Sequence, residues 1–437
     1  MAANLAIIMV TILFLVIHHQ TTPTTAATNV VKTEVFRSPE MVMEPGLVSN
    51  KDYFNVEFPR GHIGLKSFNA ELVDERGNLL PLHEVYLHHW VLNRYFAREN
   101  RSGADDLSIV RNSGICGNRL TQYFGVGAET RRTSTYIPHP YAIQVGDPAT
   151  IPEGYEEGWV LNVHAIDTRG ADDKMGCTEC RCNLYGFSEA GGGLHCCPDD
   201  GRCRLKQGFR GENKTIYLRY TVKYVDWDSS SIVPVDIYIL DVTDVWTKAD
   251  QSKGIRATHY CKVEYGVESC GVGVEKDGCV DTKSVTFSFP VGGEVVYGVG
   301  HQHAGGVGTT LYDQGGRTIC SSKPIYGEGN EAGNEAGFIV GMSTCYPTPA
   351  APVKILAGET LTLVSNYSSV ESHTGVMALF YLLLAHSQPK PLPTLASKFM
   401  MVPEFVWPIV LLGVVVIVVV VAWKGIIGNS EGYETIP

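Results

Sequence analysis

Six side chains in four separate segments of the sequence are suited to binding copper. They are His88 and His89 in VYLHHWVL, His164 in LNVHAID, His301 and His303 in GVGHQHAGG, and Met377 in TGVMALFY. Imidazole suits copper in either oxidation state, whereas the soft thioether of methionine favours Cu(I). The set therefore divides into a three-histidine group and a group of two histidines and one methionine, which predicts two copper ions in unlike sites.

The spacing of the histidines makes different demands on the backbone. His301 and His303 lie two residues apart, so a strand presents both rings on one face. His88 and His89 are adjacent and would point to opposite faces of a regular strand. To share a metal they need a strand end or a β-bulge, with one ring binding through its nearer nitrogen. Each motif alone is equally typical of a packed core or surface residue, and the combination is what indicates copper.

Short β-rich runs separated by Gly, Pro, Asp and Asn must position these ligands. Between residues 35 and 385 they include YLHHWVLN, GWVLNVHAID, TIYLRYTVKYVDW, VPVDIYILDV, SVTFSFP, EVVYGVGHQH, TLTLVSNYS and VMALFYLLLA. This spacing is typical of β-sandwiches and barrels. We predict an all-β protein with two tandem antiparallel, jelly-roll-like β-sandwich domains. The first, residues 35–228, would hold the three-histidine site, and the second, residues 232–386, the His-His-Met site.

Both ends of the chain carry apolar segments. Residues 5–17 predict a signal peptide over residues 1–27, with an uncleaved anchor as the alternative. A stalk at 388–404 precedes the uncharged segment 405–423, long enough for a transmembrane helix, and a cytosolic tail at 424–437. The polar tail disfavours a GPI signal. We expect a single-pass type I membrane protein of the secretory pathway with an extracellular or luminal ectodomain. A net charge of −11 argues against nucleic acid as a partner.

The twelve cysteines fit an oxidising compartment. Six of them lie between Cys177 and Cys203, where CxxC spacing also allows a zinc knot. We expect a disulfide framework, whose connectivity the sequence leaves open. Sequons at Asn100, Asn213 and Asn366 are consistent with a glycoprotein.

The order of the ligand motifs resembles that of the copper type II, ascorbate-dependent monooxygenases, the family of peptidylglycine α-hydroxylating monooxygenase and dopamine β-hydroxylase. By this resemblance the three-histidine group would hold an electron-storage copper that ascorbate reduces, and the His-His-Met group a copper that reacts with dioxygen. A substrate C–H bond, in a small molecule or a peptide, would be hydroxylated. Tyr381, four residues after Met377 as in that family, is the predicted catalytic residue.

Some residues depart from the monooxygenase pattern. Ala378 stands where those enzymes usually have a disulfide-bonded cysteine, and Trp90 replaces the methionine after the His-His pair. No arginine precedes His301, whereas the peptide hydroxylase has one there that holds the carboxylate of its substrate. This difference puts a peptide substrate in doubt. Met342 competes with Met377 as the thioether ligand, and we prefer Met377 because its surroundings match better.

The segments HHWVLNRYF, GAETRRTSTYIPHPYAI, MGCTECRCNLYG and GFIVGMSTCYP are similar to the plant family of stress up-regulated nodulin proteins. Three interpretations follow. The chain is a copper monooxygenase of unknown substrate, a non-catalytic cell-surface or copper-binding glycoprotein that retains the fold, or a stress-associated structural glycoprotein without copper.

Overall fold

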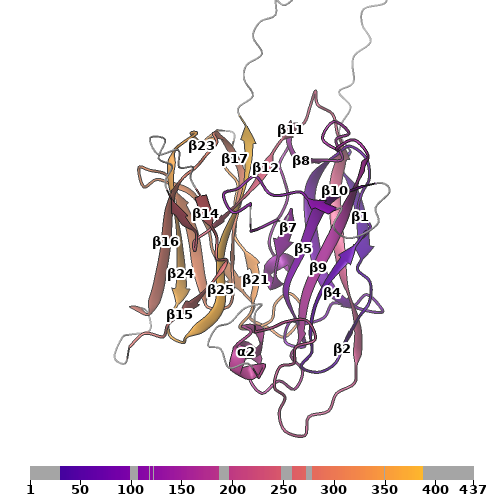
Figure 1. Ribbon diagram of the computed structural model, residues 1–437. Helices are drawn as coiled ribbons and strands as arrows, with labels where there is room; N and C mark the ends of the chain where they lie inside the picture. The colour runs from indigo at the N-terminus through magenta and orange to yellow at the C-terminus, as the bar shows by residue number, and fades with distance from the viewer. Residues whose placement is uncertain are drawn as a thin grey trace, which may run out of the picture. The chain divides into compact units, whose positions relative to one another are not determined.

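The computed structural model describes residues 30–98, 107–117, 119–121, 123–186, 196–247, 258–271, 278–348 and 350–386. These residues belong to one compact unit, and their regular secondary structure is almost entirely β-strand (Figure 1), which confirms the all-β prediction. The predicted signal peptide, stalk, membrane segment and tail lie outside them. Among the described residues, no helix has both the length and the apolar character needed to span a bilayer.

Two sheets come from the first half of the chain. The β10 sheet has the order β1-β10-β4-β8-β11, with β2 also on β10, and the β5 sheet has the order β3-β9-β5-β6, with β7 also on β5. Pairing is antiparallel except between β8 and β11. The strands are β1 Lys32–Arg37, β2 Met41–Met43, β3 Val48–Phe54, β4 Ile63–Asp74, β5 Val85–Arg98, β6 Leu107–Ile109, β7 Phe124–Val126, β8 Tyr141–Val145, β9 Tyr155–Asp167, β10 Lys214–Asp226 and β11 Val233–Pro234.

Two further sheets come from the second half. The β25 sheet has the order β12-β25-β17-β22, with β15 on β25 and β23 on β17, and the β24 sheet has the order β16-β24-β18-β19. Their strands are β12 Asp236–Asp241, β15 Glu264–Val267, β16 Val280–Ser288, β17 Gly293–Gln302, β18 Gly306–Tyr312, β19 Thr318–Ser322, β22 Thr344–Cys345, β23 Lys354–Ile355, β24 Thr360–Ser368 and β25 His373–His386.

The small elements are two hairpin-like pairs and three short helices. The pairs are β13 Val245–Thr247 with β14 Thr258–Tyr260, and β20 Pro324–Tyr326 with β21 Ile339–Met342. The helices are η2 Ala128–Arg131, α2 Lys174–Thr178 and η3 Cys182–Leu184.

Side-chain burial explains how the sheets pack. β24 alternates buried and half-buried residues, as a strand does when one face meets a core. β25 is buried on both faces, because Leu379 and Leu383 join the core of the first half while Phe380 and Leu382 join a core shared with the β24 sheet (Figure 1). The β25 sheet is therefore an inner layer, in contact with the part of the molecule that carries His88 and His164.

All twelve cysteines are paired, which confirms the disulfide framework and leaves no free thiolates for a zinc knot. Three bridges lie close together in the loop between β9 and β10, and Cys116–Cys261 links the two halves of the chain. The bridges are Cys116–Cys261, Cys177–Cys203, Cys180–Cys197, Cys182–Cys196, Cys270–Cys279 and Cys320–Cys345.

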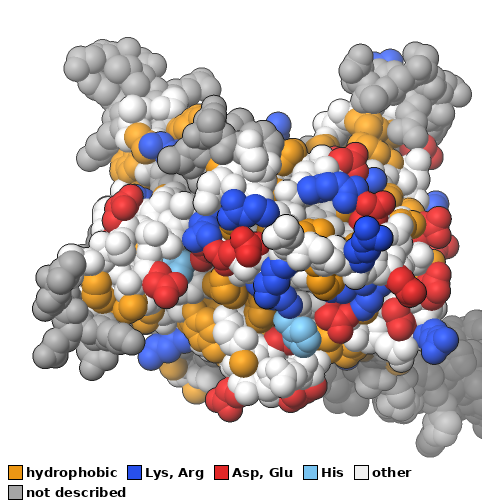
Figure 2. Space-filling model, turned by 90° about the horizontal axis from the view of Figure 1, so that it is seen from below, with side chains coloured by type: hydrophobic (Ala, Val, Ile, Leu, Met, Phe, Trp, Pro, Cys, Tyr) orange, Lys and Arg blue, Asp and Glu red, His pale blue; other side chains and the backbone are white. Residues whose placement is uncertain are grey.

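The face of the molecule seen in Figure 2 carries acidic and basic side chains that are interspersed rather than separated by sign. Most ion pairs of the described residues are local to one sheet or loop, such as Arg219 with Glu71 across β10 and β4. Surface pairs of this kind add little stability. The histidine groups, by contrast, lie inside the fold.

Candidate metal centre

A β-bulge on β5 brings the two adjacent histidines together. Leu87 stands opposite Ala165 and His89 opposite His164 on β9, so His88 is an extra residue in the ladder. Because the bulge interrupts the alternation of side chains, both rings turn to the same side, and the Nδ1 atoms of His88 and His89 lie 3.4 Å apart. The bulge that the HH motif requires is present.

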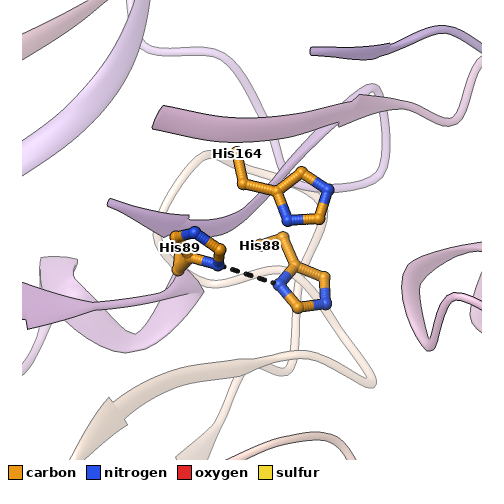
Figure 3. Close-up of side chains that lie close together, drawn as sticks. All are labelled: His88, His89 and His164. Atoms are coloured by element: carbon orange, nitrogen blue, oxygen red, sulfur yellow. Dashed lines mark hydrogen bonds between the residues drawn. The ribbon is translucent and has the colours of Figure 1, made fainter. Parts of the chain in front are cut away.

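His164 completes the three-histidine group (Figure 3). Its ring centroid lies 4.4 Å from that of His88 and 5.0 Å from that of His89. The side chain is fully buried, and its Nδ1 has no hydrogen-bond partner among the described residues. A buried polar nitrogen without a hydrogen-bond partner lowers the stability of the fold, unless a ligand such as a metal ion binds it.

The three rings fit a single metal ion. One ring nitrogen from each histidine lies within 4.8 Å of the others. Nitrogens bound at about 2.0–2.1 Å in tetrahedral geometry are roughly 3.4 Å apart. The observed separation of the His88 and His89 Nδ1 atoms equals that value, so a small inward movement of His164 alone would close the set.

Asn162 determines which nitrogen of His89 is available. Its Nδ2 donates to Asn50 Oδ1 at 3.1 Å and to Asp52 Oδ1 at 3.0 Å, which turns its Oδ1 toward His89 Nε2 at 2.8 Å. That oxygen only accepts, so His89 carries its proton on Nε2 and presents the lone pair of Nδ1 to His88 and His164. A ligating histidine is usually held in this way by its other nitrogen.

The second group lies at the end of β17. His301 and the following His303 present their rings on one side, with centroids 5.2 Å apart. His301 Nδ1 donates to the buried carboxylate of Glu129, whose other oxygen accepts from Gly127 N at 3.0 Å. The Nε2 of His301 is therefore the nitrogen that faces a metal, in the carboxylate–histidine arrangement common at metal sites.

Met377 and Tyr381 lie on β25 and line one cavity of about 150 Å³ together with His89, His301 and His303. Met377 is 8% exposed, and the pairing of His301 with Leu379 places it next to the end of β17. The rest of the lining is apolar: Val91, Leu120, Gly125, Val126, Val263 and Leu379. Met342, the competing methionine, is buried in the main core and is absent from this lining.

The two predicted groups adjoin each other. The ring centroids of His88 and His303 are 5.1 Å apart, with the planes nearly perpendicular. His89 lines the cavity that holds the second group, while His88 and His164 lie behind it. The sequence predicts two copper ions in unlike sites, and in the structure the five rings of the two groups form one continuous histidine cluster.

Burial favours the neutral form of four of these imidazoles, those of His88, His89, His164 and His303. Desolvation lowers the pKa of His89 to about 4 and that of His303 to about 3, and it lowers the pKa values of His88 and His164 well below their usual range. Burial opposes ionisation of Glu129, but the neighbouring His301 outweighs it and lowers the pKa of that carboxyl. Neutral imidazoles are the form that binds metal.

Sequence patterns did not identify Glu129 and Asn162 as parts of this centre. Asn162 precedes His164 by two residues on β9, a spacing that places both on one face of the strand and could have suggested it. Glu129 lies in η2, and only the tertiary fold brings it to His301. The Cys180–Cys197 bridge also borders the centre, with Cys197 Sγ 3.6 Å from His164 Nε2.

A disulfide-linked, β-sandwich-like fold with a buried histidine cluster defines the class of this protein. The chain belongs to the Stress up-regulated Nod 19 family, whose model matches residues 29–387. No curated protein matches the sequence.

Solved structures give only distant similarity. The Cry4Aa toxin from Bacillus thuringiensis is 7% identical with a TM-score of 0.17, and the match covers 82% of this chain and 59% of the toxin. The VP2 subviral particle of infectious bursal disease virus is 10% identical with a TM-score of 0.17, covering 82% of this chain and 72% of VP2. These scores are too low to support a shared fold.

Proposed function

We propose that this stress-related family member is a copper-dependent, ascorbate-driven C–H monooxygenase of the secretory pathway, anchored by its C-terminal segment. The observation that carries the proposal is the convergence of five histidines and Met377 from four distant segments. His89, His301, His303 and Met377 line one cavity, and His88 and His164 adjoin His89 behind it. A packed core has no need of five imidazoles whose rings lie next to one another. Their ring nitrogens, held by Asn162 and Glu129, suit copper in both oxidation states.

Each group of side chains has a distinct part in this proposal. Bound copper would supply one-electron chemistry between ascorbate and dioxygen. The all-nitrogen group, His88, His89 and His164, suits electron storage, while the thioether of Met377 favours the Cu(I) state that meets dioxygen. Tyr381 lines the same cavity and would contact the substrate. The apolar walls limit the entry of water.

A second candidate function is copper binding without catalysis. The 5.1 Å separation of the His88 and His303 rings favours it, because a continuous cluster could hold its ions as one store rather than as two sites with separate roles. In that case the protein would be a cell-surface copper glycoprotein that takes up no oxygen.

Copper stoichiometry of the full-length chain, purified in detergent and reconstituted with Cu(I), tests both candidates. About two bound ions, with loss of about one in His301→Ala, is the result expected for two functional sites. Loss of both ions in that variant favours the shared store. Ascorbate-dependent oxygen uptake separates the enzyme from the store, and absence of bound copper contradicts both.

A further inference from the structure

The cavity beside the histidine cluster is unusual for its lack of charge. None of the described residues that line it is Lys, Arg, Asp or Glu. Its polar atoms belong to imidazoles and to the hydroxyl of Tyr381. The two carboxylates that bond lining residues already have partners. Glu129 is paired with His301 and with the backbone of Gly127, and Asp241 accepts from the backbone of Val263 and from Thr243. A carboxylate or ammonium group placed in this space would lose its water and would meet no side chain of opposite charge among the lining residues.

The size of the cavity limits what it can hold. Its volume is about 150 Å³, and an apolar cavity of about 150 Å³ is known to bind a single benzene ring. It therefore accommodates one ring-sized group rather than an extended peptide.

The apolar space continues away from the histidines. A second cavity, of about 30 Å³, shares Gly125, Val126 and Tyr381 with the first. Its other walls include Phe68, Phe124 and Tyr297. Tyr381 thus stands between an aromatic-lined recess and the imidazoles. Aromatic side chains offer favourable edge and stacking contacts to a ring.

We infer that this cavity is a binding site for an uncharged, ring-sized apolar group, and that such a group is the part of the substrate presented to the copper centre. The second clause rests on the proposed function, whereas the binding site does not. The inference excludes the charged carboxylate of a peptide terminus and the ammonium of an aromatic amine from the cavity itself.

Three ligands that share one ring and differ only in charge test the inference: para-cresol, para-hydroxybenzoate and para-hydroxybenzylamine. Ligand-detected NMR on the full-length chain in detergent, without added copper, measures their binding. Because burial of an unpaired charge is costly, para-cresol should bind at least about tenfold more tightly than either charged ligand. Equal binding of the three would overturn the inference.

A cavity-filling variant locates the binding. Val91 is half-buried and lines the cavity, whereas Val364 is half-buried on β24 and lies outside its lining. Val91→Phe should weaken para-cresol binding about tenfold or more, and Val364→Phe should leave it unchanged. The control also accounts for partition of the ligand into detergent. Equal effects of the two substitutions would count against the site.

A third measurement does not depend on how Val91→Phe folds. Nuclear Overhauser contacts between para-cresol and isotope-labelled methionine methyl groups should reach the signal that disappears in Met377→Leu. Contacts to other methionines alone would overturn the inference. The binding assay contains no copper, so it tests the cavity separately from the copper centre. If the protein binds para-cresol but fails to retain copper in the stoichiometry experiment, the binding site is supported and the monooxygenase is refuted. Copper retention without preference for the neutral ring refutes the site alone.

Discussion

The carboxylate of Glu129 and the imidazole of His301, 172 residues apart in sequence, form a hydrogen bond in which both side chains are buried. The pair joins η2 of the first half to β17 of the second. It also settles which nitrogen of His301 faces the cavity, because the carboxylate accepts only from Nδ1.

Weakening this pair should weaken the metal centre. In Glu129→Gln the charge that holds His301 is lost, and copper affinity should fall about 10–100-fold, as is usual when the partner of a ligating histidine is removed. Competition with a chelator measures the affinity. Glu335→Gln is the matched control, since Glu335 is similarly buried and pairs with Arg131 of the same helix η2 rather than with a histidine. Similar losses in both variants would contradict a specific role for Glu129.

The two candidate methionines can be distinguished by the same conservative change. Met377→Leu keeps volume and apolar character but removes the thioether, so retention of Cu(I) by the second group should drop about tenfold or more while Cu(II) binding changes little. Met342→Leu, in the core, should leave copper unaffected. Bicinchoninate competition under reducing conditions provides the readout, and a larger effect at Met342 would reverse the assignment.

The pair of His373 with Glu179 should make stability depend on pH. The hydrogen bond that His373 Nδ1 donates to Glu179 Oε1, at 2.7 Å, raises the pKa of His373 above its ordinary value of 6.5. A histidine whose pKa is higher in the folded than in the unfolded protein stabilises the fold. The contribution is complete below the pKa of the unfolded protein and is lost as pH rises through the pKa of the folded protein. Wild type should therefore exceed His373→Gln in Tm most at about pH 6 and progressively less toward about pH 8.

Thermal unfolding of both proteins across this range checks the pair. Glu179→Gln should remove the same pH-dependent increment, because the carboxylate is the first cause of the raised pKa. A Tm difference that grows with pH would have the wrong sign for this linkage.

Removal of the Cys180–Cys197 bridge should affect both stability and metal binding. The double change Cys180→Ser with Cys197→Ser should cost about 2–5 kcal/mol of unfolding free energy. Because Cys197 contacts His164, copper at the three-histidine group should also be lost. The control is the Cys270–Cys279 pair, which closes a loop with a sequence separation of 9 and, within the described part of the chain, makes no hydrogen bond to the five clustered histidines. Retention of full copper in the first variant would show that the bridge does not support His164.

The positions of most long strands could be predicted, because each forms a β-rich run bounded by Gly, Pro, Asp or Asn in the sequence. The runs around β5, β9, β10, β16, β17, β24 and β25 all form strands. β4 was missed, since IGLKSFNAELVD mixes polar residues into a 12-residue strand that crosses the middle of its sheet. The His88 bulge was one of two possibilities that the sequence offered, because adjacent histidines that share a metal need a strand end or a bulge.

The contacts between distant segments could not be predicted. Nothing near Glu129 in sequence indicates that η2 lies against β17, and nothing near His303 indicates that its ring meets His88. These contacts depend on how the inner face of the β25 sheet packs on the first half, and a single sequence does not specify that packing.

β25 supplies alternate residues to two hydrophobic cores, with Leu379 and Leu383 on one side and Phe380 and Leu382 on the other. Unfolding of either core would therefore expose one apolar face of this strand to water. The free energy of unfolding of one half thus depends on whether the other half is folded. Heating should produce one calorimetric transition rather than two, with equal calorimetric and van't Hoff enthalpies. A truncation ending before β12 would then leave an apolar face uncovered and give a chain prone to aggregation instead of an independent module.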